Sequence, residues 1–136
     1  MKKKSFTLIE ILVVATIIGL LAAAATASYT QLGKQSRDAR RKTDLEQIRS
    51  ALEMYRSNND QYSAYTGNCS SYTALTGSPT YIQSMPTDPM STYFYYCNIS
   101  TTDYTISAYM ETGGTTCVAS QCGKNCNYCL GPYGQK

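Results

Sequence analysis

Hydrophobic and polar residues divide the chain into three stretches of different character. Residues 6–27 are almost wholly apolar, and about twenty apolar residues suffice to cross a bilayer core as a helix. Residues 33–56 are highly charged, whereas the chain from Ser57 onward is rich in Tyr, Ser, Thr, Asn, Gly and Cys. The globular part therefore has at most about 80 residues, a size at which a hydrophobic core alone gives only marginal stability.

The charged stretch has the periodicity of an amphipathic helix. Apolar residues recur there at spacings of three and four, namely Leu45, Ile48, Ala51, Leu52 and Tyr55. The pattern assigns the charged residues to the remaining faces, which we interpret as solvated or inter-subunit: Arg40, Arg41, Asp44, Glu46, Arg49, Glu53 and Arg56. The polar run 57–60 suits a helix end.

Together these stretches predict one helix over residues 6–57. Its first half, 6–28, is apolar on all sides and therefore lies in a membrane or is buried in protein, and its second half, 29–57, lies on a globular region, 58–136. Gly19 and the alanines at 22–25 permit close approach of neighbouring helices. Because no proline precedes Pro79, an intact helix is favoured over one that unwinds near Gly19.

The globular region has the features of a small antiparallel sheet. Pro86 and Pro89 flank a turn, residues 93–99 are aromatic and favour a strand, and residues 100–103 interrupt it. Residues 104–110 alternate, with Tyr104, Ile106 and Ala108 on one face. The prediction is an α+β fold in which the long helix packs on this sheet.

The N-terminus resembles a secretory signal peptide, but it contains an acidic residue that such a peptide does not need. Three lysines precede the apolar run, as in an ordinary secretory signal peptide, and the alanines at 22–25 could provide its cleavage site. Glu10, however, lies inside the apolar run, where a carboxylate costs roughly a few kcal/mol and is usually functional or paired. The helical pattern also continues beyond the alanines.

The residues KKKSFTLIEILVV resemble the class III signal of type IV prepilins and pseudopilins. The resemblance implies cleavage between Ser5 and Phe6, N-methylation of Phe6, and a Glu10 that pairs with the amino terminus of a neighbouring subunit. Gly19 corresponds to a glycine that gives the family's helix local flexibility. One departure is that Ser5 stands where the family usually has glycine.

Six cysteines follow the helix, and they favour disulfides in an extracytoplasmic compartment: Cys69, Cys97, Cys117, Cys122, Cys126 and Cys129. A zinc site is a weaker alternative because only Cys126 and Cys129 form a CxxC pair. Nothing around that pair resembles the βαβ unit of a thioredoxin-like site. By proximity we expect Cys69 to pair with Cys97, and the other four to form two bridges within the tail.

Composition argues against several other activities. Without Lys2, Lys3 and Lys4 the chain is neutral, so nucleic-acid binding is not indicated. There is no histidine, and no catalytic residue or cofactor site is suggested. A calcium site is disfavoured as well, since the available acids, Asp88, Asp103 and Glu111, are scattered in sequence. We therefore expect neither an enzyme nor a metal site.

The leading hypothesis is a structural subunit of a type IV pilus-like helical filament, a homopolymer of identical chains. The resemblance implies a prepilin peptidase, an assembly ATPase and a platform protein as partners. It also implies the cytoplasmic membrane before assembly and an extracellular or periplasmic filament afterwards. The alternative is a monomeric single-pass membrane protein with a small extracytoplasmic domain that binds a ligand or metal.

Overall fold

A single long helix precedes all the other elements of the chain. The computed structural model describes residues 6–114, 117 and 122–136. Helix α1 spans Leu8–Asn59 and stays helical through Gly19, so the predicted long helix is confirmed with both ends displaced by two residues. Two compact units meet within α1, the first ending at Lys34 and the second beginning at Gln35.

The C-terminal end of α1 is set by one residue. Asp60 has a φ of 62°, a left-handed conformation that Asp tolerates better than most side chains. Its N–H donates to the carbonyl of Arg56 at 2.8 Å, which satisfies one of the carbonyls left free at the helix end.

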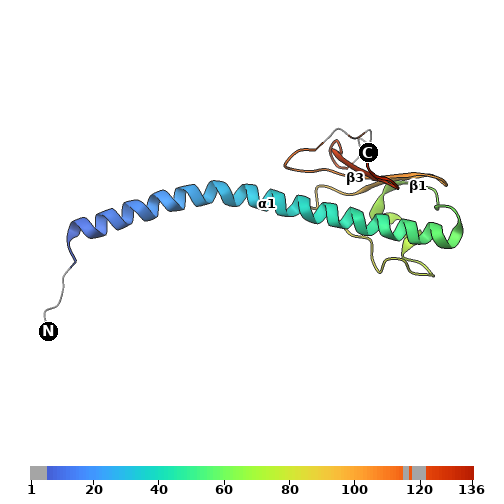
Figure 1. Ribbon diagram of the computed structural model, residues 1–136, viewed down its shortest axis with the longest axis horizontal. Helices are drawn as coiled ribbons and strands as arrows, with labels where there is room; N and C mark the ends of the chain where they lie inside the picture. Colours follow the sequence, from blue (N-terminus) through green and yellow to red (C-terminus); the bar gives the residue numbers. More distant parts are fainter. Residues whose placement is uncertain (1–5, 115–116, 118–121) are drawn as a thin grey trace. The chain divides into compact units, whose positions relative to one another are not determined.

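The second unit contains a five-stranded antiparallel sheet beside α1 (Figure 1). The strands lie in the order of the sequence, β1 (Tyr65–Asn68), β2 (Tyr96–Ile99), β3 (Tyr104–Ala108), β4 (Tyr128–Gly131) and β5 (Gly134–Gln135). Two short 3-10 helices follow β1, η1 (Cys69–Ser71) and η2 (Thr73–Leu75). The predicted α+β arrangement is therefore confirmed.

The stretches predicted at 93–99 and 104–110 contain β2 and β3, which pair antiparallel with Ile99 opposite Tyr104. On β3 the expected face is buried, with Tyr104, Ile106 and Ala108 each at most 1% exposed. Ser107, predicted on the other face, is buried too, because Cys129 of β4 pairs opposite it. The strand before the break is shorter than predicted and begins at Tyr96.

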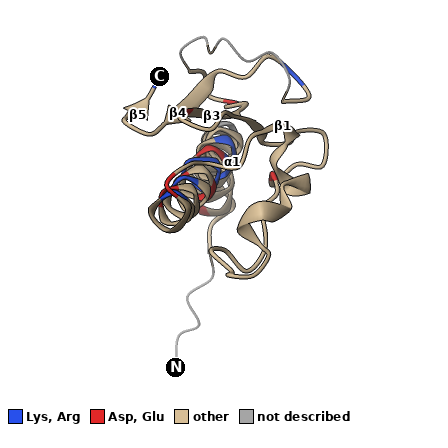
Figure 2. Ribbon diagram, turned by 90° about the vertical axis from the view of Figure 1, so that its right-hand side faces the viewer, with Lys and Arg blue, Asp and Glu red and all other residues tan. Residues whose placement is uncertain are grey.

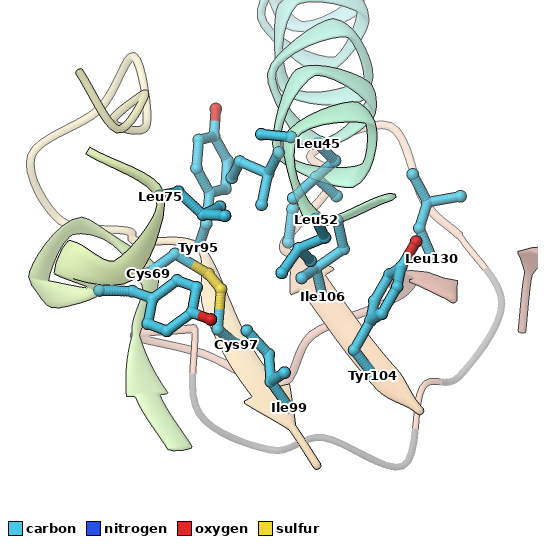
Figure 3. Packing of buried hydrophobic residues seen from close by; sticks show 14 of the residues in the cluster. Leu45, Leu52, Cys69, Leu75, Tyr95, Cys97, Ile99, Tyr104, Ile106 and Leu130 are labelled. Atoms are coloured by element: carbon cyan, nitrogen blue, oxygen red, sulfur yellow. A yellow bond between two sulfur atoms is a disulfide. The ribbon is translucent and has the colours of Figure 1, made fainter. Parts of the chain in front are cut away.

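The core lies between the sheet and the second part of α1 (Figure 3). Leu45, Ile48 and Leu52 from the helix are fully buried against Ile106 and Leu130 of the sheet. The core also contains buried tyrosines, and the hydroxyls of Tyr62, Tyr95 and Tyr104 reach carboxylates on the helix.

Two helix carboxylates accept these tyrosine hydroxyls. Tyr104 donates to Glu53 at 2.7 Å, and Tyr95 donates to Asp44 at 2.7 Å. Tyr62 also donates to Glu53, and its ring packs edge-on against Tyr104 with centroids 5.0 Å apart. Burial, reinforced by the adjacent carboxylates, raises the pKa of Tyr95 and of Tyr104.

One sequence prediction about the helix is wrong. Arg41 and Asp44 were assigned to faces away from the core, but they are 0% and 8% exposed, and Asp38 is only 4% exposed. Figure 2 shows charged residues along α1, and ion pairs join Arg41 of this helix to Asp88 and Glu111 in the second unit's loops. Burial of these charges is possible because each has a partner of opposite charge or a hydrogen-bond donor.

Shortening a side chain on the core face of α1 should lower the free energy of unfolding far more than shortening one on the exposed face of the same turn. We expect Leu52→Ala, at a fully buried site, to lower the free energy of unfolding by about 2–5 kcal/mol. Met54→Ala, at a site 49% exposed, should stay within about 0.5 kcal/mol of the parent. Denaturant unfolding followed by near-ultraviolet circular dichroism of the tyrosines would measure both. Equal effects would contradict the assigned packing.

Candidate functional site

The N-terminus of α1 is capped by two side chains that hydrogen-bond reciprocally. Thr7 precedes the first helical residue, and its N–H and hydroxyl donate to Oε2 of Glu10 at 2.9 and 2.8 Å. The N–H of Glu10 in turn donates to the Thr7 hydroxyl at 3.4 Å. This is a capping box, in which a Thr and a Glu three residues later satisfy the free N–H groups of a helix start.

This capping role of Glu10 was not predicted, although the spacing Thr-x-x-Glu signals it. Only Oε2 of the carboxylate takes part in these bonds within the described residues, so Oε1 is open to a further partner. Phe6, the expected new terminus, lies just before the cap and is 77% exposed.

The apolar residues that follow the cap are exposed throughout the first unit. Large aliphatic side chains face outward on every side of the helix, including Leu8, Ile9, Leu12, Val13, Ile17 and Leu20. By length and composition α1 can cross a membrane. A helix apolar on all sides needs either lipid or protein around it.

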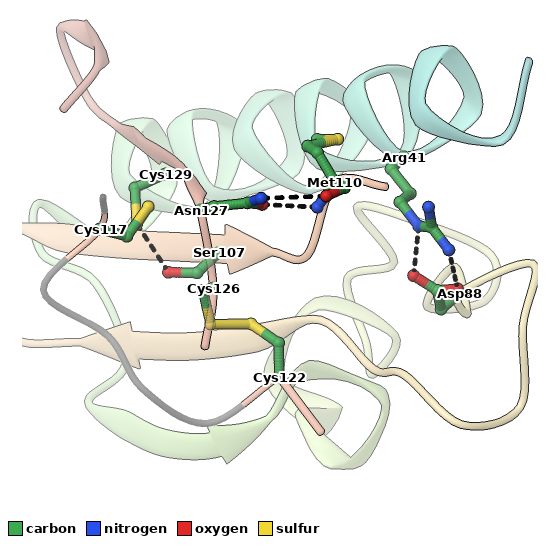
Figure 4. Close-up of a disulfide and its surroundings, with 9 residues drawn as sticks. All are labelled: Arg41, Asp88, Ser107, Met110, Cys117, Cys122, Cys126, Asn127 and Cys129. Atoms are coloured by element: carbon green, nitrogen blue, oxygen red, sulfur yellow. Dashed lines mark hydrogen bonds and ion pairs between the residues drawn. A yellow bond between two sulfur atoms is a disulfide. The ribbon is translucent and has the colours of Figure 1, made fainter. Parts of the chain in front are cut away.

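A separate cluster of charges in the second unit is centred on Arg41, whose side chain is 0% exposed (Figure 4). Its Nε and Nη2 donate to the two oxygens of Asp88 at 2.7 and 2.9 Å, a bidentate pair. Its Nη1 donates to Asp38 at 2.8 Å and to Glu111 at 2.9 Å. Arg37 adds a second pair of bonds to Glu111, at 2.7 and 2.6 Å.

The carboxylates of this cluster also fix the backbone of the loops. Asp38 accepts from the N–H groups of Glu111 and Thr112 at 2.9 and 2.8 Å, and from the Thr112 hydroxyl. Asp88 accepts from the N–H of Met90 at 2.8 Å. The cluster thus ties two distant segments to one turn of the helix.

These contacts shift the pKa values of Arg41 and Glu111 toward the charged forms. Burial alone would lower the pKa of Arg41, but its bonds to Asp88, Glu111 and Asp38 outweigh burial and raise it. The hydrogen bond from Arg37, followed by that from Arg41, lowers the pKa of Glu111 from its ordinary 4.5 to about 2. These shifts favour the charged forms of Arg41 and Glu111 at neutral pH.

A stack of rings and cations leads from Arg41 to the tail of the chain. The Arg41 guanidinium lies 5.6 Å from the centroid of the Tyr93 ring, and the Tyr93 and Tyr109 rings are 4.8 Å apart. The ammonium of Lys124 lies 5.2 Å from the Tyr109 ring. Such contacts between cations and rings are worth roughly 0.5–2 kcal/mol each, depending on desolvation.

The six cysteines form three disulfides, as the composition predicted, and the pairs are Cys69–Cys97, Cys117–Cys129 and Cys122–Cys126. The first joins η1 to β2 within the core (Figure 3). The other two lie in the tail. Cys117–Cys129 joins the tail to β4, where the Cys129 sulfur lies 3.2 Å from the Ser107 hydroxyl of β3. The carboxamide of Asn127 adds a two-way hydrogen bond with the backbone of Met110 (Figure 4).

The acids considered for calcium have other partners. A guanidinium lies between Asp88 and Glu111, whereas Asp103 pairs elsewhere, with Lys136 at 2.8 Å. Asp88 and Glu111 are therefore partners of Arg41 rather than isolated surface acids. In the part of the chain that the structure describes, no group of three His, Cys, Asp or Glu side chains is placed to hold a metal ion.

Comparison with known proteins bears on the N-terminal site alone. Residues 1–26 match the family model of the prokaryotic N-terminal methylation motif. This motif is the class III prepilin signal of type IV pilins and pseudopilins, so the resemblance seen in the sequence is confirmed. No curated protein and no solved structure matches the chain significantly. The motif and the apolar helix support a type IV pilin-like membrane-anchored protein.

Neighbouring arginines on α1 provide a matched test of the charge cluster. Arg41→Ala leaves three carboxylates without their shared cation, and we expect a loss of about 3–5 kcal/mol in the free energy of unfolding. Arg40→Ala removes an arginine whose side chain is 66% exposed, so its effect should stay within about 0.5 kcal/mol. Similar stabilities of the two variants would contradict the central position of Arg41.

The lowered pKa of Glu111 predicts a specific loss of stability in acid. A carboxylate whose pKa is depressed by folding stabilises the protein above its ordinary pKa and ceases to do so as the pH falls through its folded pKa. The difference in unfolding free energy between the parent and Glu111→Gln should therefore shrink as the pH falls from 4.5 to about 2. Denaturant titrations across this range would measure it. A difference that is independent of pH would exclude the proposed ion pairs.

Proposed function

We propose that the chain is the precursor of a structural subunit of a type IV pilus-like helical filament. A prepilin peptidase cleaves it between Ser5 and Phe6, Phe6 is N-methylated, and the mature chain is assembled from the membrane. The observation that carries this proposal is the methylation motif at residues 1–26, which continues directly into an exposed apolar helix.

The apolar part of α1 supports two successive environments for one segment. Before assembly its side chains face lipid, with the lysines of the leader on the cytoplasmic side. After assembly the same side chains face the equivalent segments of neighbouring subunits. Gly19 and the alanines at 22–25 favour close packing there, because small side chains allow helix backbones to approach.

Glu10 supplies the register of that packing. A charge in an apolar environment is unfavourable unless it is paired, and cleavage creates a positive amino terminus at Phe6 on every subunit. The capping box uses Oε2 of Glu10 and leaves Oε1 for the amino terminus of a neighbour. An ion pair between successive subunits removes both desolvation costs and builds a heterologous contact that does not close on itself.

The second unit is the part that the filament carries on its surface. In this proposal it faces the periplasm or the exterior, where its three disulfides are stable. The assembly ATPase acts from the cytoplasm and the platform protein from the membrane, so neither needs to contact this unit. The Cys-rich tail favours a surface pilus over a purely secretory filament.

Variants of the capping box separate the two roles of Glu10. Glu10→Gln keeps a side chain that can accept from Thr7 but removes the charge, so we expect filaments to be lost while membrane insertion persists. Thr7→Ala removes the hydroxyl of the capping box but keeps the acid, so filaments should still form. Electron microscopy of sheared fractions and fractionation of membranes would measure both.

Two results would contradict this role. Normal filaments from Glu10→Gln would mean that the charge is not needed, leaving a membrane-anchored monomer or a different assembly contact. Loss of filaments from Thr7→Ala, to the same degree as from Glu10→Gln, would mean that Glu10 acts by closing the helix start.

A further inference from the structure

The second unit contains a cavity of about 490 Å³ whose wall includes Asp88 of the charge cluster and Tyr95 of the core. It opens between η1 and the loop that leads into β2, and its lining includes Asn68, Ser70, Ser91, Tyr93 and Phe94. Its volume falls within the roughly 300–1,000 Å³ of small-molecule sites in proteins.

Both walls of this cavity are fixed. On one side, Cys69 is bonded to Cys97 of β2, and its N–H donates to the carbonyl of Tyr95 at 2.9 Å (Figure 3). On the other side, Asp88 is held by Arg41, and two prolines flank it in the same loop (Figure 4). Because its walls are already ordered, the cavity loses little conformational entropy when a ligand binds.

The lining determines which class of ligand would fit. Its polar groups are mostly hydroxyls and one carboxamide, and none of the described residues that line it is Lys or Arg. The one carboxylate in the wall, Asp88, is 1% exposed and already paired with Arg41, so neither an anion nor a free cation finds a counter-charge. Neutral donors and acceptors beside aromatic rings suit a neutral polyhydroxylated ligand.

Phe94 is the residue that marks the site. The chain has two phenylalanines, and Phe94 is the one in the globular part. It is only partly buried and does not belong to the hydrophobic core, although the next residue, Tyr95, does. A large apolar ring that is left out of the core and placed at a polar cavity can stack on the apolar face of a sugar ring.

We propose that this cavity binds a neutral saccharide, with Phe94 as the stacking residue and Asn68, Ser70 and Ser91 as hydrogen-bonding groups. The side-chain oxygen of Asn68 already accepts from the N–H and hydroxyl of Ser70, which orients its amide for a ligand. The site does not depend on filament assembly and is equally available on a membrane-anchored chain.

The test uses the full-length protein in a detergent without a sugar head group, because a maltoside would compete. Saturation-transfer NMR with lactose, maltose, cellobiose and diacetylchitobiose would find the saccharides that bind. For those that do, Phe94→Ala should weaken binding by about tenfold or more. Ser91→Trp, which fills the rim at an exposed position without touching the core, should do the same.

Tyr133→Ala is the matched control. Tyr133 is an aromatic side chain, 97% exposed at the turn between β4 and β5 and absent from the cavity lining, so its removal should leave saccharide binding unchanged. Failure of all four saccharides to bind the parent would overturn the proposal. So would binding that survives both Phe94→Ala and Ser91→Trp, or binding that Tyr133→Ala abolishes.

Discussion

A buried guanidinium holds the second unit together. Arg41 lies on the helix face that the sheet and loops cover. It contacts Asp88, which is 47 positions later in the chain, and Glu111, which is 70 positions later. An unpaired charge at such a site would be strongly destabilising, so both loops must close over it for the fold to form. The wall of the cavity, the ring stack at Tyr93 and the start of the tail all follow from this closure.

The same helix meets a different requirement in its first part. None of the residues described there is buried, and a continuous apolar surface with a single acid near its start remains exposed. One helix thus combines a segment that needs lipid or other subunits with a segment that completes a globular core. This division accounts for the change from an apolar to a charged sequence near residue 33 without a break in the helix.

Much of this arrangement could be predicted from periodicity. The helix, the pairing of β2 with β3 and the presence of disulfides each leave a local signal in the sequence. The burial of Arg41 could not be predicted, because an arginine beside an apolar stripe has the same local pattern whether solvent or distant carboxylates surround it. Strand β4 was missed for a related reason, since its sequence, YCLG, is short and its partner strand lies about twenty residues earlier. The capping box at Thr7 and Glu10 had a clear signal that was attributed wholly to assembly.

The central claim is that one apolar segment serves first as an anchor and then as part of a filament, which requires that it stays on the mature chain. Mass spectrometry of the protein purified from its native membrane or filaments tests this most directly. The account predicts a chain that begins at N-methylated Phe6 and, with three disulfides, weighs six hydrogens less than its reduced form. A chain that begins near residues 25–28 would mean that an ordinary signal peptide had been removed, and would contradict the account.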